Sequence, residues 1–358
     1  MNIYIYNLKK LDDISQKYDY INLPAEMRLF DLFLDQIKNN YNIVENICDA
    51  SLAFIPIDFT KLLFSHDHLI FYKTPDNCPI KPPTFGSDYK KDYMKFFWDN
   101  YVEEYINMKS NIPHFILHSY VLFDIDFTII PDNIYIVCYE KYVTENNNMI
   151  TVNNGSNNRT IMIPYILNEN KNYGQSKIIH YYYENVEITQ ILNNKLIDLA
   201  FFGSINKRTN MLYNSRKFLL DINLDKYTYI RGEGHMAEQN LSKIKYLFVL
   251  RGDTPTRLCF YQCFAFAVVP IIFEDELELY SNLLLPNNIN IKDSVLVLPD
   301  ISSENSYQKI EEILQYELSD NIKYINKIKN HKEIFNNFNY FNEPLSLPIK
   351  NVINYIVQ

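Results

Sequence analysis

Short apolar runs alternate with longer amphipathic segments along the 358-residue chain, a pattern typical of α/β proteins. Helical spacing predicts helices over 24–40 and 91–108, and Pro24 and Glu26 stand near the start of the first helix. The Asn-rich stretch 144–158 predicts a loop. The short apolar runs of this half predict strands at 2–8, 50–57, 113–118, 133–139 and 159–165.

The same alternation starts again near residue 176 and predicts a second α/β unit. Its predicted strands are 198–203, 226–231, 246–250, 268–273 and 294–298. Its predicted helices are 206–221, 235–244, 256–267, 304–315 and 319–330, with one more after Pro348. We therefore expect an N-terminal domain over 1–175 and a C-terminal domain over 176–340, each a doubly wound α/β domain. We expect the helix within 341–358 to be able to pack back on the N-terminal domain.

Composition supports a folded protein and narrows its partners. Hydrophobic residues make up 47% of the chain and charged residues 22%, as in ordinary globular proteins. The net charge of −9 argues against a nucleic-acid binder. No apolar run approaches the ~20 residues that span a membrane, and no leader segment precedes the first strand. We therefore expect a soluble, cytoplasmic protein. Residue usage skewed toward Asn, Ile, Lys and Tyr indicates an AT-rich genome, which would suit a viral protein in a host cytoplasm or a protist protein.

The five cysteines form no CxxC pair, so neither a disulfide framework nor a zinc site is predicted. Cys259 and Cys263 lie one helical turn apart in an apolar stretch and are expected to be buried thiols.

Arginine and glycine are scarce, and both gather in the second half. Of seven arginines, five fall between 208 and 257, and of seven glycines, four fall between 203 and 252. Arginine offers a planar fork for phosphate, and glycine lets the backbone approach a ligand. Arg216 is the exception, because we expect it on the outer face of a helix.

Two predicted strand-to-helix junctions collect these residues. Ligands of open α/β sheets bind beyond the carboxyl ends of strands, where helix N-termini attract anions. Neither junction is a Walker A loop or a GxGxxG fingerprint, so ATPase and NAD-dependent functions are not supported. The residues expected to hold a diphosphate are Phe202, Gly203, Lys207 and Arg208 in the first junction, and Arg251, Gly252, Asp253, Thr254, Thr256 and Arg257 in the second.

At these junctions the chain resembles exostosin-like glycosyltransferases, family 47. The segments DLAFFGSINKR, RGDTPTR, LCFYQCFAFA and VVPII are similar to successive motifs of that family's C-terminal half, and its acidic residue after the last motif corresponds to Asp275. More loosely, IYIYNL, CDASLAFIPI, PHFILHS and RTIMIPY are similar to its N-terminal half. Two positions depart from the pattern: Gln262 replaces an acidic residue expected to hold the ribose, and Ala267-Val268 replaces Gly-Cys, a change expected to affect packing.

The resemblance implies a GT-B fold, with two facing Rossmann-like domains and the active site in the cleft between them. It implies an inverting transfer from a UDP-sugar, without a metal or other cofactor, to a glycan or another hydroxyl acceptor. Gln262 and the junction residues would bind the donor. His114 matches a family histidine and is our candidate base, although a hydrogen-bonded structural histidine fits equally. Glu26, Asp124 and Asp126 remain alternative bases.

Three alternatives stay open. A degenerate member could bind glycan or nucleotide without turnover, for which Gln262 is the main support. A different GT-B enzyme could use another nucleotide-sugar. Asp124-Ile125-Asp126 could instead hold Mn²⁺ or Mg²⁺, as in GT-A-like transferases, and that reading requires metal dependence.

Overall fold

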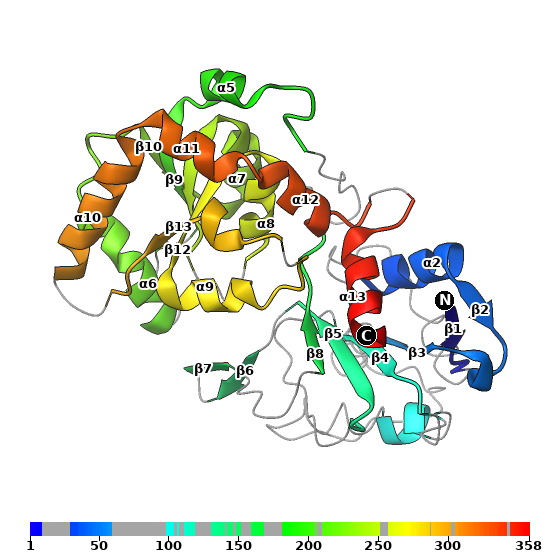
Figure 1. Ribbon diagram of the computed structural model, residues 1–358. Helices are drawn as coiled ribbons and strands as arrows, with labels where there is room; N and C mark the ends of the chain where they lie inside the picture. The colour runs from blue at the N-terminus through cyan, green and yellow to red at the C-terminus, as the bar shows by residue number, and fades with distance from the viewer. Residues whose placement is uncertain are drawn as a thin grey trace, which may run out of the picture. The chain divides into compact units, whose positions relative to one another are not determined.

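The chain forms two compact units, one of them discontinuous in sequence. The computed structural model describes residues 1–8, 29–58, 98–103, 106, 111–118, 130–139, 142–145, 148–151, 159–167, 181–203, 205, 210–250, 257–286, 288–301, 305–341 and 344–358. The first unit comprises Met1–Ile163 and Glu343–Gln358, and the second comprises Pro164–Asn342 (Figure 1). The division falls at 163/164, before the boundary expected at 175/176.

The first unit is built on a parallel sheet. Among its described strands the order is β2-β1-β3-β4-β5-β8, and every neighbouring pair is parallel. All five residues of β4 are buried, as expected for a strand covered on both faces. The strands are β1 Asn2–Ile5, β2 Asn42–Val44, β3 Leu52–Asp58, β4 His114–His118, β5 Ile134–Cys138 and β8 Thr160–Met162.

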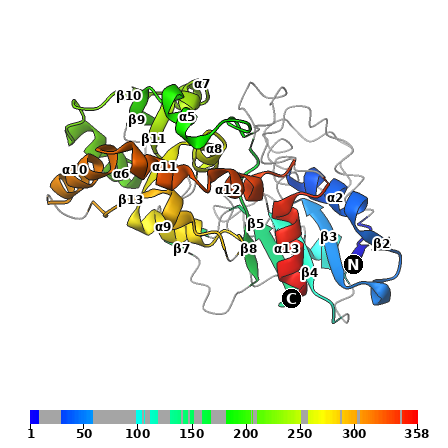
Figure 2. The same cartoon turned by 45° about the horizontal axis from the view of Figure 1, so that its top comes forward.

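Helices α2 and α13 join this sheet from opposite ends of the sequence. Helix α2 (Leu29–Asn40) buries Leu29, Phe33 and Ile37, which are spaced by four and so share one helix face. Helix α13 (Leu347–Val357) has Pro at the first helical positions and buries an apolar stripe. Both views place α13 beside this unit's strands (Figures 1 and 2), and the Ser346 amide donates to Gln36 Oε1 of α2 at 3.2 Å.

The loop predicted for 144–158 is wrong in part. Strands β6 (Tyr142–Glu145) and β7 (Asn148–Thr151) pair antiparallel, with Val143 opposite Ile150. Each strand carries a β-branched residue and threonine, which favour extended backbone, but the Asn-rich composition led to the prediction of a loop.

Within the helix predicted at 91–108, Trp98–Val102 form a π-helix (η3). Ile47–Asp49 form a 3-10 helix (η2).

The second unit has a parallel sheet of the same kind. Its described strands run in the order β10-β9-β11-β12-β13, all parallel. Numbered within the unit, this is the order 2-1-3-4-5. The strands are β9 Ile197–Phe202, β10 Tyr229–Gly232, β11 Ile244–Phe248, β12 Val269–Phe273 and β13 Leu296–Leu298. The prediction of two parallel-sheet α/β domains is thereby confirmed.

Helices cover this sheet through a large apolar core. Phe201 of β9 and Phe248 of β11 share the core with Phe218 of α6, Leu314 of α10 and Tyr324 of α11. The helices are α5 Ile188–Ile191, α6 Asn210–Asp221, α7 Ala237–Asn240, α8 Leu258–Ala265, α9 Glu274–Ser281, α10 Asn305–Leu318, α11 Asn321–Ile328 and α12 His331–Phe338. Short 3-10 helices are η5 Leu192–Asn194, η6 Gly234–Met236, η7 Leu241–Lys243 and η8 Ile291–Ser294.

Helix α8 ends in an unusual way. The Val268 amide donates to the Cys263 carbonyl at 2.9 Å, which is the six-to-one bond of a Schellman motif. Ala267 therefore takes the left-handed position, with φ of +49°, where glycine is the usual residue. Ala267 thus strains the backbone where glycine would not, an effect beyond the packing change expected from the sequence.

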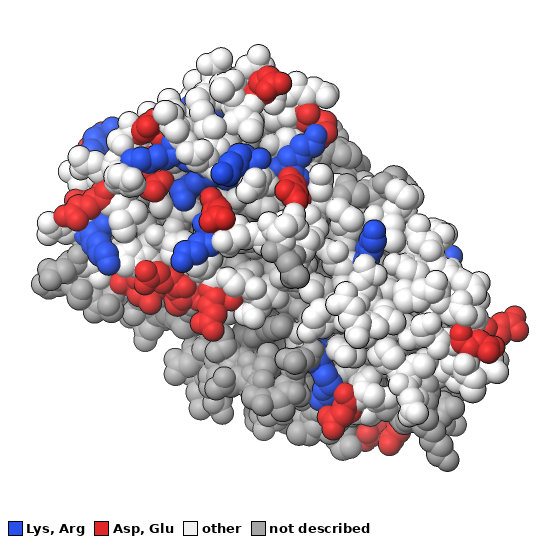
Figure 3. Space-filling model, viewed as in Figure 1, with Lys and Arg blue, Asp and Glu red and all other residues white. Residues whose placement is uncertain are grey.

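Charges of both signs intermingle over α10, α11 and α12, whereas the surface over α13 is mostly uncharged (Figure 3).

In the described residues, no helix has both the length and the apolar character that a membrane crossing needs. Among the described cysteines, Cys48, Cys138, Cys259 and Cys263 are all free; Cys263 is buried, as expected, and Cys259 is partly exposed.

Candidate functional site

The second sheet has a topological switch point at β9. From β9 the chain crosses to β10 on one side and then to β11 on the other, because the order is β10-β9-β11. The connections therefore leave the carboxyl ends of β9 and β11 in opposite directions, which opens a crevice where ligands of such sheets bind. The two junctions predicted from the sequence follow these two strands.

Gly203 and Arg257 bring the two junctions together in space. Gly203 directly follows β9, and Arg257 is the N-cap residue of α8, after β11. The Nη1 atom of Arg257 lies 3.7 Å from the position that a Cβ atom would occupy on Gly203. Phe201 Cζ lies 3.1 Å from the same position. A side chain on residue 203 would crowd the Phe201 ring and would lie in ordinary contact with the Arg257 guanidinium, so the guanidinium lies directly beside the end of β9.

Arg257 is held at two points. Its Nη1 donates to the carbonyl oxygen of Leu250 at 3.0 Å, and its backbone amide donates to the hydroxyl oxygen of Tyr280 at 3.2 Å. In the described part of the chain, no carboxylate pairs with Arg257. A guanidinium has five N–H donors, so donors remain for an anion. The geometry therefore places a fixed positive charge at the switch point.

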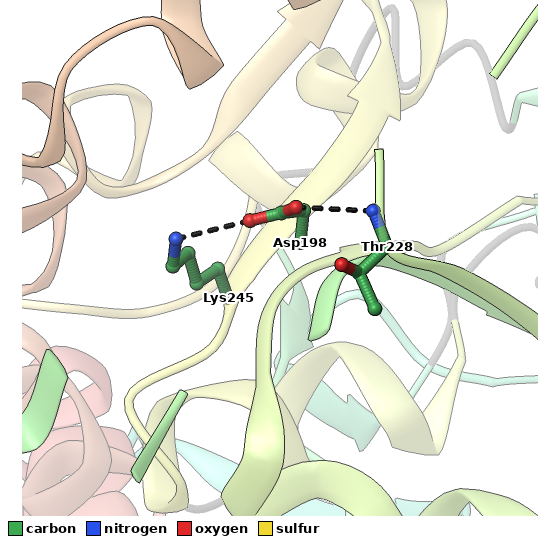
Figure 4. A network of polar contacts seen from close by, with 3 residues as sticks. All are labelled: Asp198, Thr228 and Lys245. Carbon is green, nitrogen blue, oxygen red and sulfur yellow. Dashed lines mark hydrogen bonds and ion pairs between the residues drawn. The ribbon is translucent and has the colours of Figure 1, made fainter. Parts of the chain in front are cut away.

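At the amino edge of the sheet, where β9, β10 and β11 begin, polar side chains contact one another. Asp198 of β9 accepts from the Thr228 amide at 3.1 Å, just before β10 (Figure 4). The same carboxylate pairs with Lys245 of β11, with Nζ and Oδ1 3.0 Å apart. Charge at the amino edge is thus neutralised within the protein, whereas at the carboxyl edge Arg257 brings positive charge.

A third loop, after β10, reaches the same carboxyl edge. The Gly203 amide donates to the Gly232 carbonyl at 2.9 Å, so the ends of β9 and β10 lie side by side. A Cβ atom on Gly232 would lie 2.9 Å from Met236 Sδ and 3.2 Å from the Phe202 ring, so a side chain here would require the methionine to move. Exposed Arg231 precedes it, level with Phe201 in the sheet. The rare Arg-Gly pairing was the signal for this loop, but no binding role was predicted for it.

The expectation for Arg216 was wrong. Its side chain is 7% exposed, and its guanidinium carbon lies 5.8 Å from the centre of the Phe201 ring. The planar cation stacks on the aromatic face, which allows a charged residue to face the sheet. Arg216 therefore supports Phe201, the ring that borders Gly203.

The other predicted donor residues divide into two groups. Phe202 is buried at 4% exposure, and its ring lies against Gly232. Gln262 is also 4% exposed, within α8. The following candidates lie outside the described residues: Glu26, Asp124, Asp126, Lys207, Arg208, Arg251, Gly252, Asp253, Thr254 and Thr256.

His114 occupies the amino end of β4, where it is fully buried. Its Nδ1 donates to the Ile112 carbonyl at 2.9 Å, and its Nε2 accepts from the Tyr6 hydroxyl at 2.9 Å. This assignment of protons follows from the two partners. Burial lowers the pKa of His114, and the hydrogen bond to Ile112 opposes that shift. These contacts favour the structural interpretation; the catalytic role stays a prediction.

His118 occupies the opposite, carboxyl end of β4. It lies on the same face as His114, about 13 Å along the strand at ~3.3 Å per residue. Its side chain is 4% exposed, and burial lowers its pKa to about 4, so the imidazole is neutral near pH 7. Sequence reasoning missed His118; the direction of its strand was the signal, because ligands bind at carboxyl ends.

Comparisons with known proteins add a fold likeness. No protein-family model matches the chain, and no curated protein sequence matches it. Among solved structures, HepE of Anabaena in complex with UDP-glucose is similar, with a TM-score of 0.41 and 8% identity over 99% of both chains. A glycosyltransferase from Rickettsia africae has a TM-score of 0.42 and 8% identity over 100% of this chain and 98% of that one.

A third similar structure is WaaG, a glycosyltransferase involved in lipopolysaccharide biosynthesis. Its TM-score is 0.42 and its identity 9%, over 98% of both chains. At such low identity and TM-score, the likeness identifies no residue or substrate of this chain.

Proposed function

We propose that this protein is an inverting glycosyltransferase that moves a sugar from a UDP-sugar to a hydroxyl group of a glycan or another acceptor. The observation that carries the proposal is the approach of the Arg257 guanidinium to Gly203 at the β9/β11 switch point. A fixed cation at this place suits a diphosphate, whose charge grows as it leaves the sugar. The exostosin-like motifs cover the same residues.

The transfer needs three events at the sugar. A base removes the proton of the acceptor hydroxyl, the oxygen bonds to the anomeric carbon, and the bond from that carbon to the diphosphate breaks. Arg257 would stabilise the departing UDP. Our candidates for the base are His114 and Glu26 from the sequence, and His118 from the strand direction.

The base can be identified by separating turnover from donor binding. Replacing it by glutamine or alanine should lower transfer by about 100-fold or more, while UDP affinity stays within twofold. His114→Gln and His118→Gln form a matched pair, because both histidines lie on one face of β4. If both variants keep full transfer and fold normally, the base is neither histidine.

Thermal unfolding against a panel of nucleotides and nucleotide-sugars, with and without EDTA, tests the donor. A ligand at ~100 times its dissociation constant stabilises the folded state by about 2.7 kcal/mol. We expect a shift with UDP or a UDP-sugar that EDTA leaves unchanged. A shift that requires Mn²⁺ or Mg²⁺ would instead favour the Asp124/Asp126 site, and a shift with another nucleotide alone would contradict the UDP assignment.

A binding protein without turnover is the second candidate, and Gln262 favours it. An amide can accept a hydrogen bond from a ribose, but it lacks the charge of a carboxylate. UDP binding with neither sugar transfer nor donor hydrolysis would select this candidate. Gln262→Glu should then tighten UDP-sugar binding and is the variant in which to look for gained turnover.

A further inference from the structure

Two buried tyrosine hydroxyls hold the two ends of helix α8. At its N-terminal end, the Arg257 amide donates to the Tyr280 hydroxyl oxygen at 3.2 Å. At its C-terminal end, the Tyr324 hydroxyl donates to the Ala267 carbonyl at 2.6 Å. Tyr280 is 0% exposed and Tyr324 is 1% exposed. The Tyr280 hydroxyl accepts and the Tyr324 hydroxyl donates, and only the first contact involves a residue of the candidate site.

Tyr280 is itself fixed by stacking. Its ring lies parallel to that of Phe260, with the ring centres 3.6 Å apart and the planes at 14°. Tyr280 belongs to α9, the helix that follows β12, and Phe260 belongs to α8. A rigid hydroxyl from α9 therefore accepts from the backbone amide of Arg257, the N-cap residue of α8.

The Tyr280 contact bears directly on where the Arg257 guanidinium lies. The backbone of Arg257 is anchored by Tyr280, and its Nη1 is anchored by the Leu250 carbonyl at the end of β11. With both ends of the residue held, few side-chain rotamers remain for Arg257. A pre-positioned guanidinium binds phosphate more tightly because it loses less freedom on binding.

We propose that Tyr280 is a positioning residue for diphosphate binding, acting through Arg257. The inference rests on the proposed function, since it presumes that Arg257 binds the donor diphosphate. It predicts that the Tyr280 hydroxyl affects UDP affinity, whereas the Tyr324 hydroxyl affects only the stability of the fold.

The test compares Tyr280→Phe with Tyr324→Phe in the full chain. Each variant loses one buried hydroxyl, and Tyr280→Phe keeps the ring that stacks on Phe260. Both should melt a few degrees below the wild type, about 2–4 °C for a loss of one hydrogen bond. Calorimetric titration with UDP should show an affinity about tenfold lower in Tyr280→Phe and within twofold of the wild type in Tyr324→Phe.

Titration with uridine separates the diphosphate from the nucleoside. Uridine carries no phosphate, so its affinity should be the same in both variants and in the wild type. Equal UDP affinity in the two variants would overturn the role of Tyr280 and leave the proposed function standing. An equal loss for uridine and UDP in Tyr280→Phe would also overturn it. Absence of UDP binding to the wild type would overturn the proposed function and, with it, this inference.

Discussion

The two parallel sheets share one strand order but differ in what their carboxyl edges carry. The described sheet of the first unit runs 2-1-3-4-5 and continues to β8, and that of the second unit runs 2-1-3-4-5. At the second edge Gly203 follows β9 with the Arg257 guanidinium beside it, and Gly232 ends β10. At the first edge, β4 ends in a buried histidine, His118, and Tyr6 follows β1.

The comparison shows that topology sets where a crevice lies, whereas side chains set the chemistry of that crevice. The strand order places a crevice beyond the central strands in both units. Glycines and an arginine make the second edge suited to an anion that touches the backbone. At the first edge the buried His118 imidazole is neutral near pH 7 and brings no comparable positive charge. One strand order, used twice, therefore carries a cation at one carboxyl edge and a neutral imidazole at the other.

The arginines show the same contrast. Arg159 of the first unit pairs with Asp132, with Nη2 and Oδ1 3.2 Å apart, and also donates to the Pro131 carbonyl. The positive charge of Arg159 is therefore balanced by a carboxylate of the protein itself. Arg257 is held by a carbonyl and a hydroxyl, neither of which cancels its charge.

Removing the guanidinium should have the largest effect. Arg257→Ala is expected to weaken UDP binding by about 100-fold, because charge-assisted bonds to the diphosphate are lost. Arg159→Ala is the matched control in the first unit and should leave UDP affinity unchanged, although it removes an ion pair. Calorimetric titration of both variants measures this. Equal affinity in wild type and Arg257→Ala would contradict the contrast between the two edges.

Lowering the pH should reduce the stability of the first unit through protonation of His118. Its pKa in the folded state, about 4, lies below the ordinary value of 6.5, so below pH 6.5 the unfolded chain binds a proton that the folded chain does not. Stability due to this group is therefore intact above pH 6.5 and falls as the pH drops toward 4.

Urea unfolding at pH 7 and pH 5 measures that loss. Between these values His118 should account for about 2 kcal/mol of the decrease in the free energy of unfolding. His118→Gln has no imidazole to protonate, so its decrease should be smaller by this amount. An identical pH dependence in the variant and the wild type would show that His118 does not remain neutral in the folded state.

A methyl group at the second edge should have an intermediate effect. In Gly203→Ala the new Cβ would press on Phe201, 3.1 Å away, at a backbone φ of +159° that favours glycine, and the resulting shift at the end of β9 should weaken UDP binding about tenfold. Gly234→Ala is the control, because no atom lies within 4 Å of its Cβ position. Titration should find that variant equal to the wild type. Similar losses in both would point to general disturbance of the edge.

The smallest expected effect lies away from both edges. Ala267→Gly should raise the free energy of unfolding by about 0.5 kcal/mol, since relief of the left-handed backbone exceeds the entropy that glycine adds to the unfolded chain. Ala265→Gly, in the last turn of the same helix, should lower it. Urea unfolding distinguishes them, and UDP affinity should be unchanged in both. A loss of stability in Ala267→Gly would contradict the strain.

The sheet strands could be predicted because buried parallel strands form continuous apolar runs. The predicted strands 113–118, 198–203 and 268–273 illustrate this, as each overlaps an observed strand to within one residue at either end. Helix α9 was missed because its sequence, EDELELYS, is acidic at the start and short, so its apolar positions are few. Edge strand β2, only three residues long, gives no periodic signal at all.

The candidate site was predictable in its chemistry but not in its contacts. Rare arginine and glycine marked the two junctions, and Gly203 and Arg257 do lie close together. His114 begins β4 and His118 ends it, so only His118 lies at the carboxyl edge of the sheet. Choosing between them as the base therefore required the direction of the strand. The contact between Arg257 and Tyr280 joins residues 23 apart and leaves no local pattern.

Helix α13 affects the order in which the two units can fold during synthesis. The first unit contains residues from both sides of the second, so it is incomplete until α13 has left the ribosome. Pro164–Asn342, a continuous segment, can fold earlier. Until then the surface that receives Ile349, Val352 and Ile353 is uncovered on the nascent first unit. A nonsense codon just before α13 would therefore damage the unit whose strands are translated first.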